Sequence, residues 1–290
     1  MKEFKTNDEL IDYLISKGVI VKSRTSAIKK LERCTYYSII NSYKNNFKDK
    51  NNNYLPNVIF DEIYALYEFD KNLKLIMMQY VLEVEILIKS LMANCIAENY
   101  GLQDYLDIKN FDPSASSKTV NKLISIINDE INRSYGIHLA ITHYKDNYGF
   151  IPPFVLTKIL TFGVMSKYYG LLKLQDRQKI AKYFNIPENL LKQILRNLTS
   201  VRNISAHTDR LFCFREKSTL GFKQIDSSYK CPTNNVTNFY MIMRALEFLL
   251  TKRQYHSLTK AVDREIKKLD SKLNSISINN ILKIMGFPNV

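Results

Sequence analysis

The spacing of apolar residues along the chain predicts a protein built almost entirely of α-helices. The longest pattern covers residues 58–99, where apolar side chains recur at helical spacing with no Gly or Pro. A helix of that length would extend about 60 Å, and we expect a kink or break near its middle. Shorter helices are expected at residues 7–17, 25–46, 119–134, 136–146, 153–172, 174–184, 187–201, 236–254 and 257–274, with one more in 278–290.

Two polar stretches interrupt the helical pattern and suggest where the chain divides. Residues 48–56 are rich in Asn and end in Pro, which makes them the best candidate for a linker. Residues 213–237 lose the helical period, so we expect a loop there that can include a short hairpin. We therefore predict an all-α protein with an N-terminal helical region at 1–50, a helical core at 57–215, and a loop with C-terminal helices at 216–290.

The composition agrees with a folded helical chain and points to a polyanionic partner. Gly and Pro are scarce, at 8 and 7 of 290 residues, which favours helices over a turn-rich β-protein. Lys and Arg outnumber Asp and Glu by 42 to 28, which gives a net charge of +14. Such an excess predicts affinity for polyanions, with nucleic acid first among them. A coding bias toward Lys, Asn and Ile would produce a similar composition.

Cysteine use and hydropathy indicate a cytoplasmic protein without a membrane partner. The four cysteines, at 34, 95, 213 and 231, form no CxxC pair, so we expect reduced thiols, no zinc site and no cofactor. The N-terminus is charged and lacks the apolar stretch of a signal peptide. No apolar run approaches the roughly 18 residues that a membrane span requires.

One short segment carries residue types that suit hydrolysis of RNA. Arg202 and His207 stand five positions apart in a chain with only four histidines. Arginine can hold a phosphate in a fork of hydrogen bonds, whereas histidine exchanges protons near neutral pH. Cleavage without a metal needs a base, an acid and a cation beside the phosphate. Asn203 would orient a phosphate oxygen or cap a helix that carries His207, and a two-fold dimer would supply the second proton-transfer group.

The spacing of this pair leaves a structural interpretation open. Five residues correspond to about 140° of rotation along a helix, so Arg202 and His207 would face apart on an unbroken one. We expect a helix break at Asn203 that removes this separation. The alternative is that the pair makes a buried polar contact between two helices and has no chemical role.

Charged residues elsewhere are candidates to support the pair. Glu85, on the long helix, is a candidate supporting contact to Arg202, although an i,i+4 pair with a lysine of its own helix is equally compatible. Asp70 could also reach Arg202, but we favour an i,i+4 pair with Lys74. Arg210 follows His207 by three positions and is a candidate second contact to RNA.

Five stretches of the chain, in order, carry a resemblance to a known family. Residues 198–211 read LTSVRNISAHTDRL and resemble the signature LRNxxAHxxRL of the Abi-like family, the AbiD/AbiF-type bacterial abortive-infection proteins of the HEPN superfamily. Residues 31–43 resemble the element NYYRLxxY, and residues 60–75 resemble FxxIxxLYxFDxxLR. Residues 152–169 resemble PxWxxxExLTFGxLSxLY, and residues 285–288 match the closing MGFP.

The resemblance implies a HEPN-type helical bundle with helical extensions at both ends, acting in a phage-defence or toxin–antitoxin system. It implies a metal-independent endoribonuclease whose composite site is formed by two HEPN units and leaves a 2′,3′-cyclic phosphate. Carried onto this chain, the R-x4-H motif is Arg202 and His207, with Asn203 in support. RNA would be the substrate, and an inhibitory non-coding RNA is a candidate partner.

The match is incomplete around the motif, and other functions stay open. Thr208 stands where the family often has a second histidine, Cys213 where it often has Asn, Lys158 where it often has Glu, and Thr35 where it often has Asn. The main alternative is a non-catalytic RNA-binding or sensor protein of a phage-defence system. A DNA-binding regulator would need a basic groove-reading helix in residues 7–46, and this segment is rich in tyrosine instead.

Overall fold

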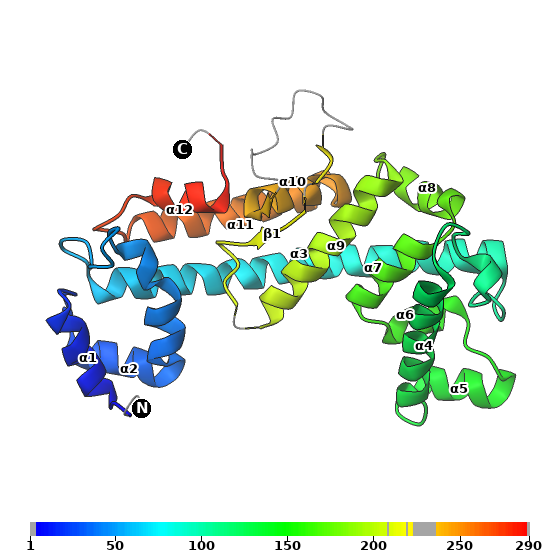
Figure 1. Cartoon of the computed structure of the whole chain (residues 1–290), viewed down its shortest axis with the longest axis horizontal. Helices are drawn as coiled ribbons and strands as arrows, with labels where there is room; N and C mark the ends of the chain where they lie inside the picture. Colours follow the sequence, from blue (N-terminus) through cyan, green and yellow to red (C-terminus); the bar gives the residue numbers. More distant parts are fainter. Residues whose placement is uncertain (1–3, 208, 219, 223–235, 289–290) are drawn as a thin grey trace.

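Helices packed along one long central helix make up the protein (Figure 1). The computed structural model describes residues 4–207, 209–218, 220–222 and 236–288. Within these residues the one sheet is a pair of two-residue strands, β1 and β2, so the prediction of an all-α fold is confirmed. The helices are α1 (Asn7–Ser16), α2 (Arg24–Cys34), η1 (Tyr37–Asn41), η2 (Lys44–Phe47), α3 (Phe60–Tyr100), η3 (Ile108–Asn110), α4 (Ser117–Ser134), α5 (Leu139–Tyr148), α6 (Pro153–Ile159), α7 (Phe162–Leu171), α8 (Leu174–Lys182), α9 (Glu188–Ala206), α10 (Phe239–Leu249), α11 (Lys252–Asp270) and α12 (Ile278–Met285).

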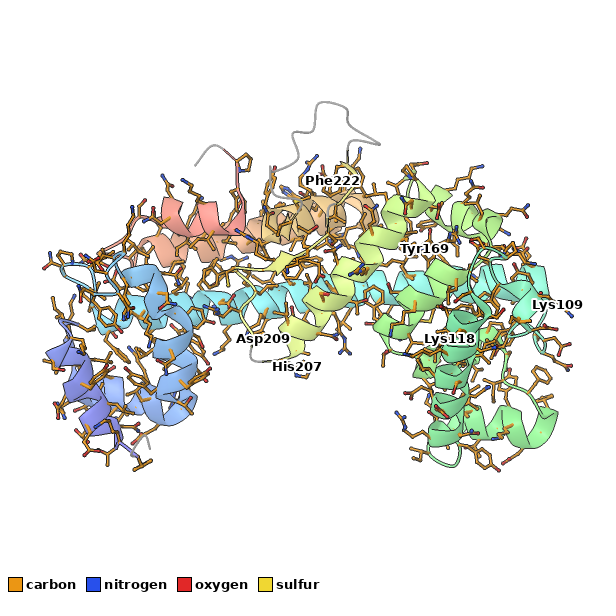
Figure 2. The ribbon with its side chains drawn as sticks, in the orientation of Figure 1. Lys109, Lys118, Tyr169, His207, Asp209 and Phe222 are labelled. Carbon is orange, nitrogen blue, oxygen red and sulfur yellow. The ribbon has the colours of Figure 1, made fainter. Side chains whose placement is uncertain are left out.

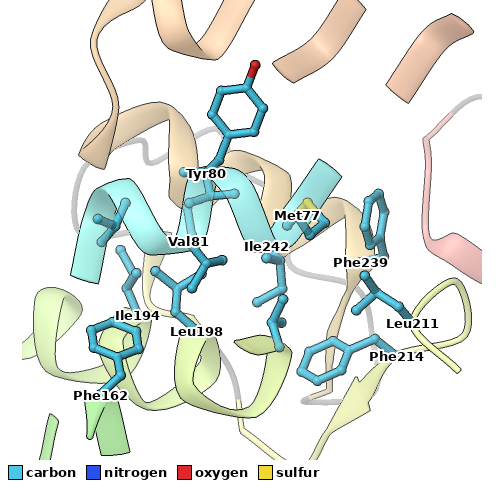
Figure 3. Packing of buried hydrophobic residues seen from close by; sticks show 14 of the residues in the cluster. Met77, Tyr80, Val81, Phe162, Ile194, Leu198, Leu211, Phe214, Phe239 and Ile242 are labelled. Carbon is cyan, nitrogen blue, oxygen red and sulfur yellow. The ribbon is translucent and has the colours of Figure 1, made fainter. Parts of the chain in front are cut away.

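The central helix α3 organises the core. It is continuous over 41 residues, so the expected break near its middle is absent. Helices α6, α9 and α11 pack along it, which buries side chains on several of its faces and explains why its apolar positions form a broad stripe. Figure 3 shows part of this packing, in which fully or nearly fully buried residues of α3 meet those of α9 and α10: Met77, Tyr80, Val81, Ile194, Leu198 and Ile242.

Two helices that the sequence pattern predicted as continuous are divided. The segment 25–46 breaks at Thr35, whose φ of +54° cannot belong to a right-handed helix. It continues as the π-helical turn η1 and the 3₁₀ turn η2. The segment 153–172 breaks at Leu160, after which the Thr161 hydroxyl accepts a hydrogen bond from Val164 N–H and caps α7. Both breaks depend on local backbone geometry, and neither changes the spacing of the apolar residues in its segment.

Glycine permits the close approach of α7 to α9. A Cβ at Gly163 would lie 3.3 Å from Thr199 Cγ2, and one at Gly170 would lie 3.1 Å from Lys192 Cε. Both distances are shorter than ordinary contacts between carbon atoms. At these two glycines the backbone of α7 therefore lies directly against side chains of α9.

The polar segment 48–56 forms a hydrogen-bonded turn. The Asp49 N–H donates to the Asn53 carbonyl at 2.9 Å, and the Leu55 N–H donates to the Phe47 carbonyl at 2.9 Å. The turn leads into α3, whose first residue donates its N–H to Ile20 O at 2.9 Å. One hydrophobic cluster includes residues on both sides of the turn. The division of the chain into 1–50, 57–215 and 216–290 stays a prediction.

The C-terminal part lies along the first half of α3. Within the expected loop, β1 (Arg215–Glu216) pairs antiparallel with β2 (Thr237–Asn238), which is the pairing of the expected hairpin. Residues 219 and 223–235 of this loop lie outside the described residues. Helix α11 packs on α3, and Glu62 accepts hydrogen bonds from the N–H groups of Asn274 and Ser275 at 3.0 and 2.9 Å. These contacts connect the end of the chain to the start of α3.

A buried ion network makes the stability of the fold sensitive to acid. Arg177 donates to Asp112 at 2.7 Å and to Glu188 at 2.8 Å, and its guanidinium lowers the pKa of Asp112 from 3.8 to about 2. Because the folded-state pKa is depressed, this stabilisation is present above pH 4 and is lost as the pH falls toward 2. The wild type should lose about 2 kcal/mol of unfolding free energy in that window through this carboxyl.

The measurement is a series of urea unfolding midpoints between pH 5 and pH 2. Asp112→Asn should be less stable than the wild type at pH 5 and should show a flatter dependence on pH. Asp129→Asn is the matched control, because Asp129 is exposed and forms no ion pair with the described residues. Equal pH slopes for the wild type and Asp112→Asn would show that the network does not stabilise the fold.

Candidate functional site

Helix α9 carries Arg202 and Asn203 in its last turn and ends immediately before His207. The expected break at Asn203 is wrong, because the helix continues to Ala206. His207 has extended backbone angles, φ −117° and ψ −173°, and its N–H donates to the carbonyls of Asn203 and Ile204 at 3.1 and 3.2 Å. The imidazole therefore leaves the helical path at the end of α9, where Figure 2 shows it on the outside of the molecule.

Arg202 extends from α9 toward the central helix. Its Nε lies 4.0 Å from Oε2 of Glu85, a residue of α3 that is only 7% exposed. The other oxygen of Glu85 lies 2.9 Å from Lys89 Nζ, so both interactions considered for this carboxylate occur together. Among the described residues, neither Arg202 Nε nor Glu85 Oε2, both of them buried atoms, has a hydrogen-bond partner. The guanidinium is thus positioned by charge, and its two Nη groups, which make no hydrogen bond to the described residues, are the donors left for an incoming acceptor.

Lys74 anchors the turn that contains His207. Its Nζ donates to the carbonyl oxygen of His207 at 3.4 Å and to that of Asp209 at 3.2 Å. Lys74 and Glu85 are eleven residues apart, which is about 20° around a straight helix. One face of α3 therefore contacts both the arginine and the histidine of the motif, and these two residues make no hydrogen bond to each other.

Asp70 holds the segment that follows the turn. This fully buried carboxylate accepts hydrogen bonds from the N–H groups of Leu211 at 3.0 Å and Phe212 at 2.7 Å, and from the Tyr43 hydroxyl at 2.8 Å. The expected ion pair between Asp70 and Lys74 is therefore wrong. The reason is that Asp70 faces the core. Two backbone N–H groups there have no partner within a helix or strand, so they need an acceptor.

Arg210 bonds to the N-terminal part of the protein. Its Nη1 donates to the carbonyl oxygen of Ser42 at 2.5 Å, so this contact and the Tyr43–Asp70 bond connect η1 with the segment after His207. The side chain of Arg210 stays exposed, and its predicted contact to RNA stays a prediction. Thr208, one of the departures from the family pattern, lies outside the described residues.

A basic groove lies between α4, α7 and α9. It has a volume of about 710 Å³ and an apolar floor that includes Leu123, and Asn203 belongs to its lining. Four cations stand around it, and Arg196 is the one with an acidic neighbour, Glu216, at 3.9 Å. Within the described part of the chain the other three cations form no ion pair. The four cations are Lys122, Lys167, Lys192 and Arg196.

The spacing of residues along α9 is a sequence signal for this groove that the overall composition does not show. Lys192, Arg196, Thr199 and Asn203 recur at spacings of four, three and four along α9, which places them on one face of a helix. That face could have been recognised as a basic stripe leading to the motif. The lysines on α4 and α7 carry no such pattern, because tertiary packing alone brings three helices together.

Other kinds of site receive no support from the described residues. Among the residues that the structure covers, no three His, Cys, Asp or Glu side chains are grouped so that they could bind a metal ion. The helices in the same part of the chain also lack the combination of length and hydropathy that crossing a bilayer requires.

The sequence can be compared with known families once this geometry is established. A family model described as Abi-like protein matches residues 29–213, which is more than half of the chain. The chain belongs to the Abi-like family. No curated protein and no solved structure matches it. The matched range of this Abi-like protein includes Asp70, Glu85, Arg202 and His207, and the family indicates a role in abortive infection, a defence of bacteria against phage.

The departures from the family pattern fall at positions with different structural roles. Thr35 adopts a positive φ, and the Asn that is common there in the family tolerates such angles better than a β-branched residue. Cys213 is half-buried, and burial raises the pKa of its thiol. Lys158 is exposed on α6. None of these three residues makes a hydrogen bond to Arg202 or His207.

Proposed function

We propose that this Abi-like protein is a metal-independent, HEPN-type endoribonuclease toxin in which Arg202 and His207 act on RNA. The observation that supports the proposal is an exposed imidazole with no hydrogen bond to the described residues. Its backbone is anchored by Lys74, and an arginine whose Nη groups make no hydrogen bond to the described residues lies five positions earlier. A residue kept only for packing would be expected to have a buried or bonded side chain, whereas an acid–base group needs access to its substrate.

The proposed reaction is an internal transesterification. An imidazole accepts the proton of a ribose 2′-hydroxyl, and the 2′-oxygen forms a bond to the adjacent phosphorus. The bond from phosphorus to the 5′-oxygen breaks, and this oxygen takes a proton from an imidazolium. The products are a 2′,3′-cyclic phosphate and a 5′-hydroxyl. Arg202 would stabilise the charge on the non-bridging phosphate oxygens with Glu85 as its positioning residue, and Asn203 would orient one of these oxygens.

Two copies of the chain would complete such a site. In an in-line displacement the attacking 2′-oxygen and the leaving 5′-oxygen lie on opposite sides of the phosphorus. One imidazole would not reach both, so a second His207 from a partner copy would serve as the other group. A surface suited to this contact borders the motif, because α3 exposes Leu75, Leu82 and Ile86 by 63%, 40% and 66%. These residues form one stripe, and two of them directly follow Lys74 and Glu85 along the helix.

The test is cleavage of a labelled single-stranded RNA by the purified protein in excess chelator. We expect 2′,3′-cyclic phosphate ends, and the activity per chain should rise with protein concentration over the range in which sedimentation shows dimers. Cleavage that requires an added divalent cation would contradict the metal-independent mechanism. Activity that is equal in the monomeric and dimeric ranges would contradict the two-copy site.

The basic groove favours a second candidate function, an RNA-binding or sensor protein that does not cleave. Three cations without acidic partners over an apolar floor suit a strand whose phosphates meet the rim and whose bases meet the floor. The same charge would allow an inhibitory RNA to occupy the groove and restrain the enzyme. Protein isolated from its host without bound RNA, and without salt-dependent affinity for RNA, would contradict this restraint.

Neutralising the groove should weaken RNA binding. Lys167→Gln combined with Lys192→Gln is expected to lower affinity for single-stranded RNA at least about tenfold at low salt and to reduce the slope of log K against log salt by about 1.4, because each lost contact to a single strand removes about 0.7. Fluorescence anisotropy at several salt concentrations measures both. Lys252→Gln with Lys260→Gln on α11 is the control of equal charge. Equal effects of the two pairs would show that net charge, rather than the groove, binds RNA.

A further inference from the structure

A second pocket lies in the N-terminal part of the protein. Figure 1 shows α1 at one end of the long helix α3, and α4 and α7, which border the basic groove, toward the other end. The second pocket is formed by the end of α1, the turns η1 and η2, and the loop 48–54, and it has a volume of about 250 Å³. Its lining combines three cations with three aromatic rings: Lys17, Lys44, Lys48, Tyr13, Tyr36 and Tyr54.

The three lysines of this pocket gather without an acidic partner. Lys44 Nζ donates to Asn41 Oδ1 at 2.6 Å and Lys48 Nζ donates to Asn52 Oδ1 at 2.9 Å, and both acceptors are neutral amides. Within the described residues none of the three lysines forms an ion pair. Burial and the nearby charges of Lys44 and Lys17 lower the pKa of Lys48. An anion placed among these three ammonium groups would relieve their repulsion.

The acidic groups near this pocket are already engaged by other donors. The Asp49 carboxylate opposes the lowering of the Lys48 pKa. It also accepts hydrogen bonds from the N–H groups of Asn51 and Asn53, both at 2.9 Å. On α1, the carboxylates of Asp8 and Asp12 bind Arg24 at 2.8 and 2.5 Å. Only Asp49 therefore opposes the three lysines, and the net charge around the pocket is positive.

The aromatic rings beside the lysines provide a surface for a planar group. Lys48 Nζ lies 4.9 Å from the centre of the Tyr54 ring, and Lys17 Nζ lies 5.6 Å from that of Tyr13. Burial raises the pKa of Tyr54 to about 12 and also raises that of Tyr36, so both hydroxyls remain neutral donors. Nucleobases stack on tyrosine rings of this kind.

We propose that this pocket binds one nucleoside monophosphate unit, with the phosphate among Lys17, Lys44 and Lys48 and the base against the tyrosine rings. The volume is below the range for drug-sized ligands, which suits a single nucleotide rather than a length of chain. The unit would come either from a free nucleotide or from the phosphorylated end of an RNA. This site is separate from the Arg202–His207 motif and does not depend on ribonuclease activity.

The experiment is calorimetric titration of the full-length protein with adenosine monophosphate. The wild type should bind it more tightly than inorganic phosphate or adenosine. Lys44→Gln with Lys48→Gln should weaken binding at least about tenfold, because two of the three cations are removed. Lys5→Gln with Lys118→Gln, two exposed lysines on segments that do not form the pocket, should leave the affinity unchanged. Tyr13→Leu should weaken binding of the nucleotide more than binding of phosphate.

Two results would overturn the proposal. One is no binding of adenosine monophosphate at millimolar concentration, and the other is an equal loss in the pocket variant and in its control. The source of the unit is decided by competition with a 5′-phosphorylated 2′-O-methyl hexanucleotide, which cannot form a cyclic phosphate. Displacement of the nucleotide by this strand, but not by its unphosphorylated form, identifies an RNA end as the ligand. Failure of both strands to compete, with binding of the nucleotide intact, identifies a free nucleotide.

Discussion

His207→Ala is expected to lower the rate of RNA cleavage by this Abi-like protein by about 10²–10⁴-fold, the range for removing a group that transfers protons. The substitution should leave the fold intact, because the exposed imidazole makes no hydrogen bond to the described residues and α9 ends through the backbone of His207. The measurements are the cleavage rate of a labelled single-stranded RNA, growth after induction in a bacterial host, and a urea unfolding curve.

Matched variants make this result specific to the motif. His256→Ala removes an equally exposed histidine from α11 and should have no effect on cleavage. Arg202→Lys keeps the positive charge but loses the planar guanidinium that binds a phosphate through two hydrogen bonds. This variant should therefore cleave RNA more slowly than the wild type and faster than Arg202→Ala. Persistent cleavage and growth inhibition in His207→Ala with an intact fold would show that the chain is not a ribonuclease of this kind.

The binding-only alternative makes the opposite prediction for the same variants. If cleavage and growth inhibition disappear in His207→Ala while affinity for RNA is retained, a non-catalytic role is wrong. If the wild type binds RNA and inhibits growth without cleaving it, the sensor or binding function is favoured. RNA affinity and RNA cleavage must therefore be measured on the same preparation.

Asp70→Ala is expected to lower the free energy of unfolding by about 3–5 kcal/mol, because three buried donors lose their acceptor and each unsatisfied group costs about 1–3 kcal/mol. The substitution would leave the N–H groups of Leu211 and Phe212 and the Tyr43 hydroxyl without an acceptor inside the core. Burial raises the pKa of Asp70, and these hydrogen bonds oppose that rise. The segment after His207 would lose its attachment to α3, so cleavage should also fall at temperatures where the variant remains folded.

The controls for Asp70 separate the carboxylate from the bonds that it accepts. Tyr43→Phe removes one of the three hydrogen bonds and should lower the free energy of unfolding by about 1–2 kcal/mol. Asp70→Asn keeps an oxygen acceptor, so its free energy of unfolding should lie between those of Tyr43→Phe and Asp70→Ala. Amide hydrogen exchange at Leu211 and Phe212 should become faster in Asp70→Ala than in Tyr43→Phe. A free energy of unfolding for Asp70→Ala no lower than that of Tyr43→Phe would show that the backbone contacts contribute little.

Much of the fold could be predicted from the sequence, because the helices are long and their apolar period is clear. The uninterrupted pattern over residues 58–99 becomes α3, and the helices expected at 119–134 and 174–184 are present within a few residues of their predicted ends. The errors occur where one residue ends a helix. Thr35 does so through a positive φ, and Leu160 through an extended backbone after which the Thr161 side chain caps the start of α7. Neither feature changes the apolar period of its segment.

The candidate site divides in a similar way. Residue types and motif spacing predicted Arg202, Asn203 and His207 as candidates, because their chemistry is intrinsic to the side chains, and this assignment stays a prediction. The position of α9's end, five residues later than expected, could not be predicted, since the mixed polar and apolar residues at 203–206 are compatible with a helix or a loop. The supporting contacts of His207 and its neighbours depend on α3, more than 130 residues earlier in the chain.

The sequence alone thus determined the helical class and the family and singled out Arg202 and His207 as the candidate pair, since periodicity, motif order and side-chain chemistry are properties of the chain itself. Only the tertiary structure decided what surrounds that pair. Asp70 accepts bonds from amides 141 and 142 residues away, and the basic groove and the lysine–tyrosine pocket each combine residues from separate elements. Such neighbours meet because apolar faces pack together, and no local pattern records which polar side chains that packing brings into contact.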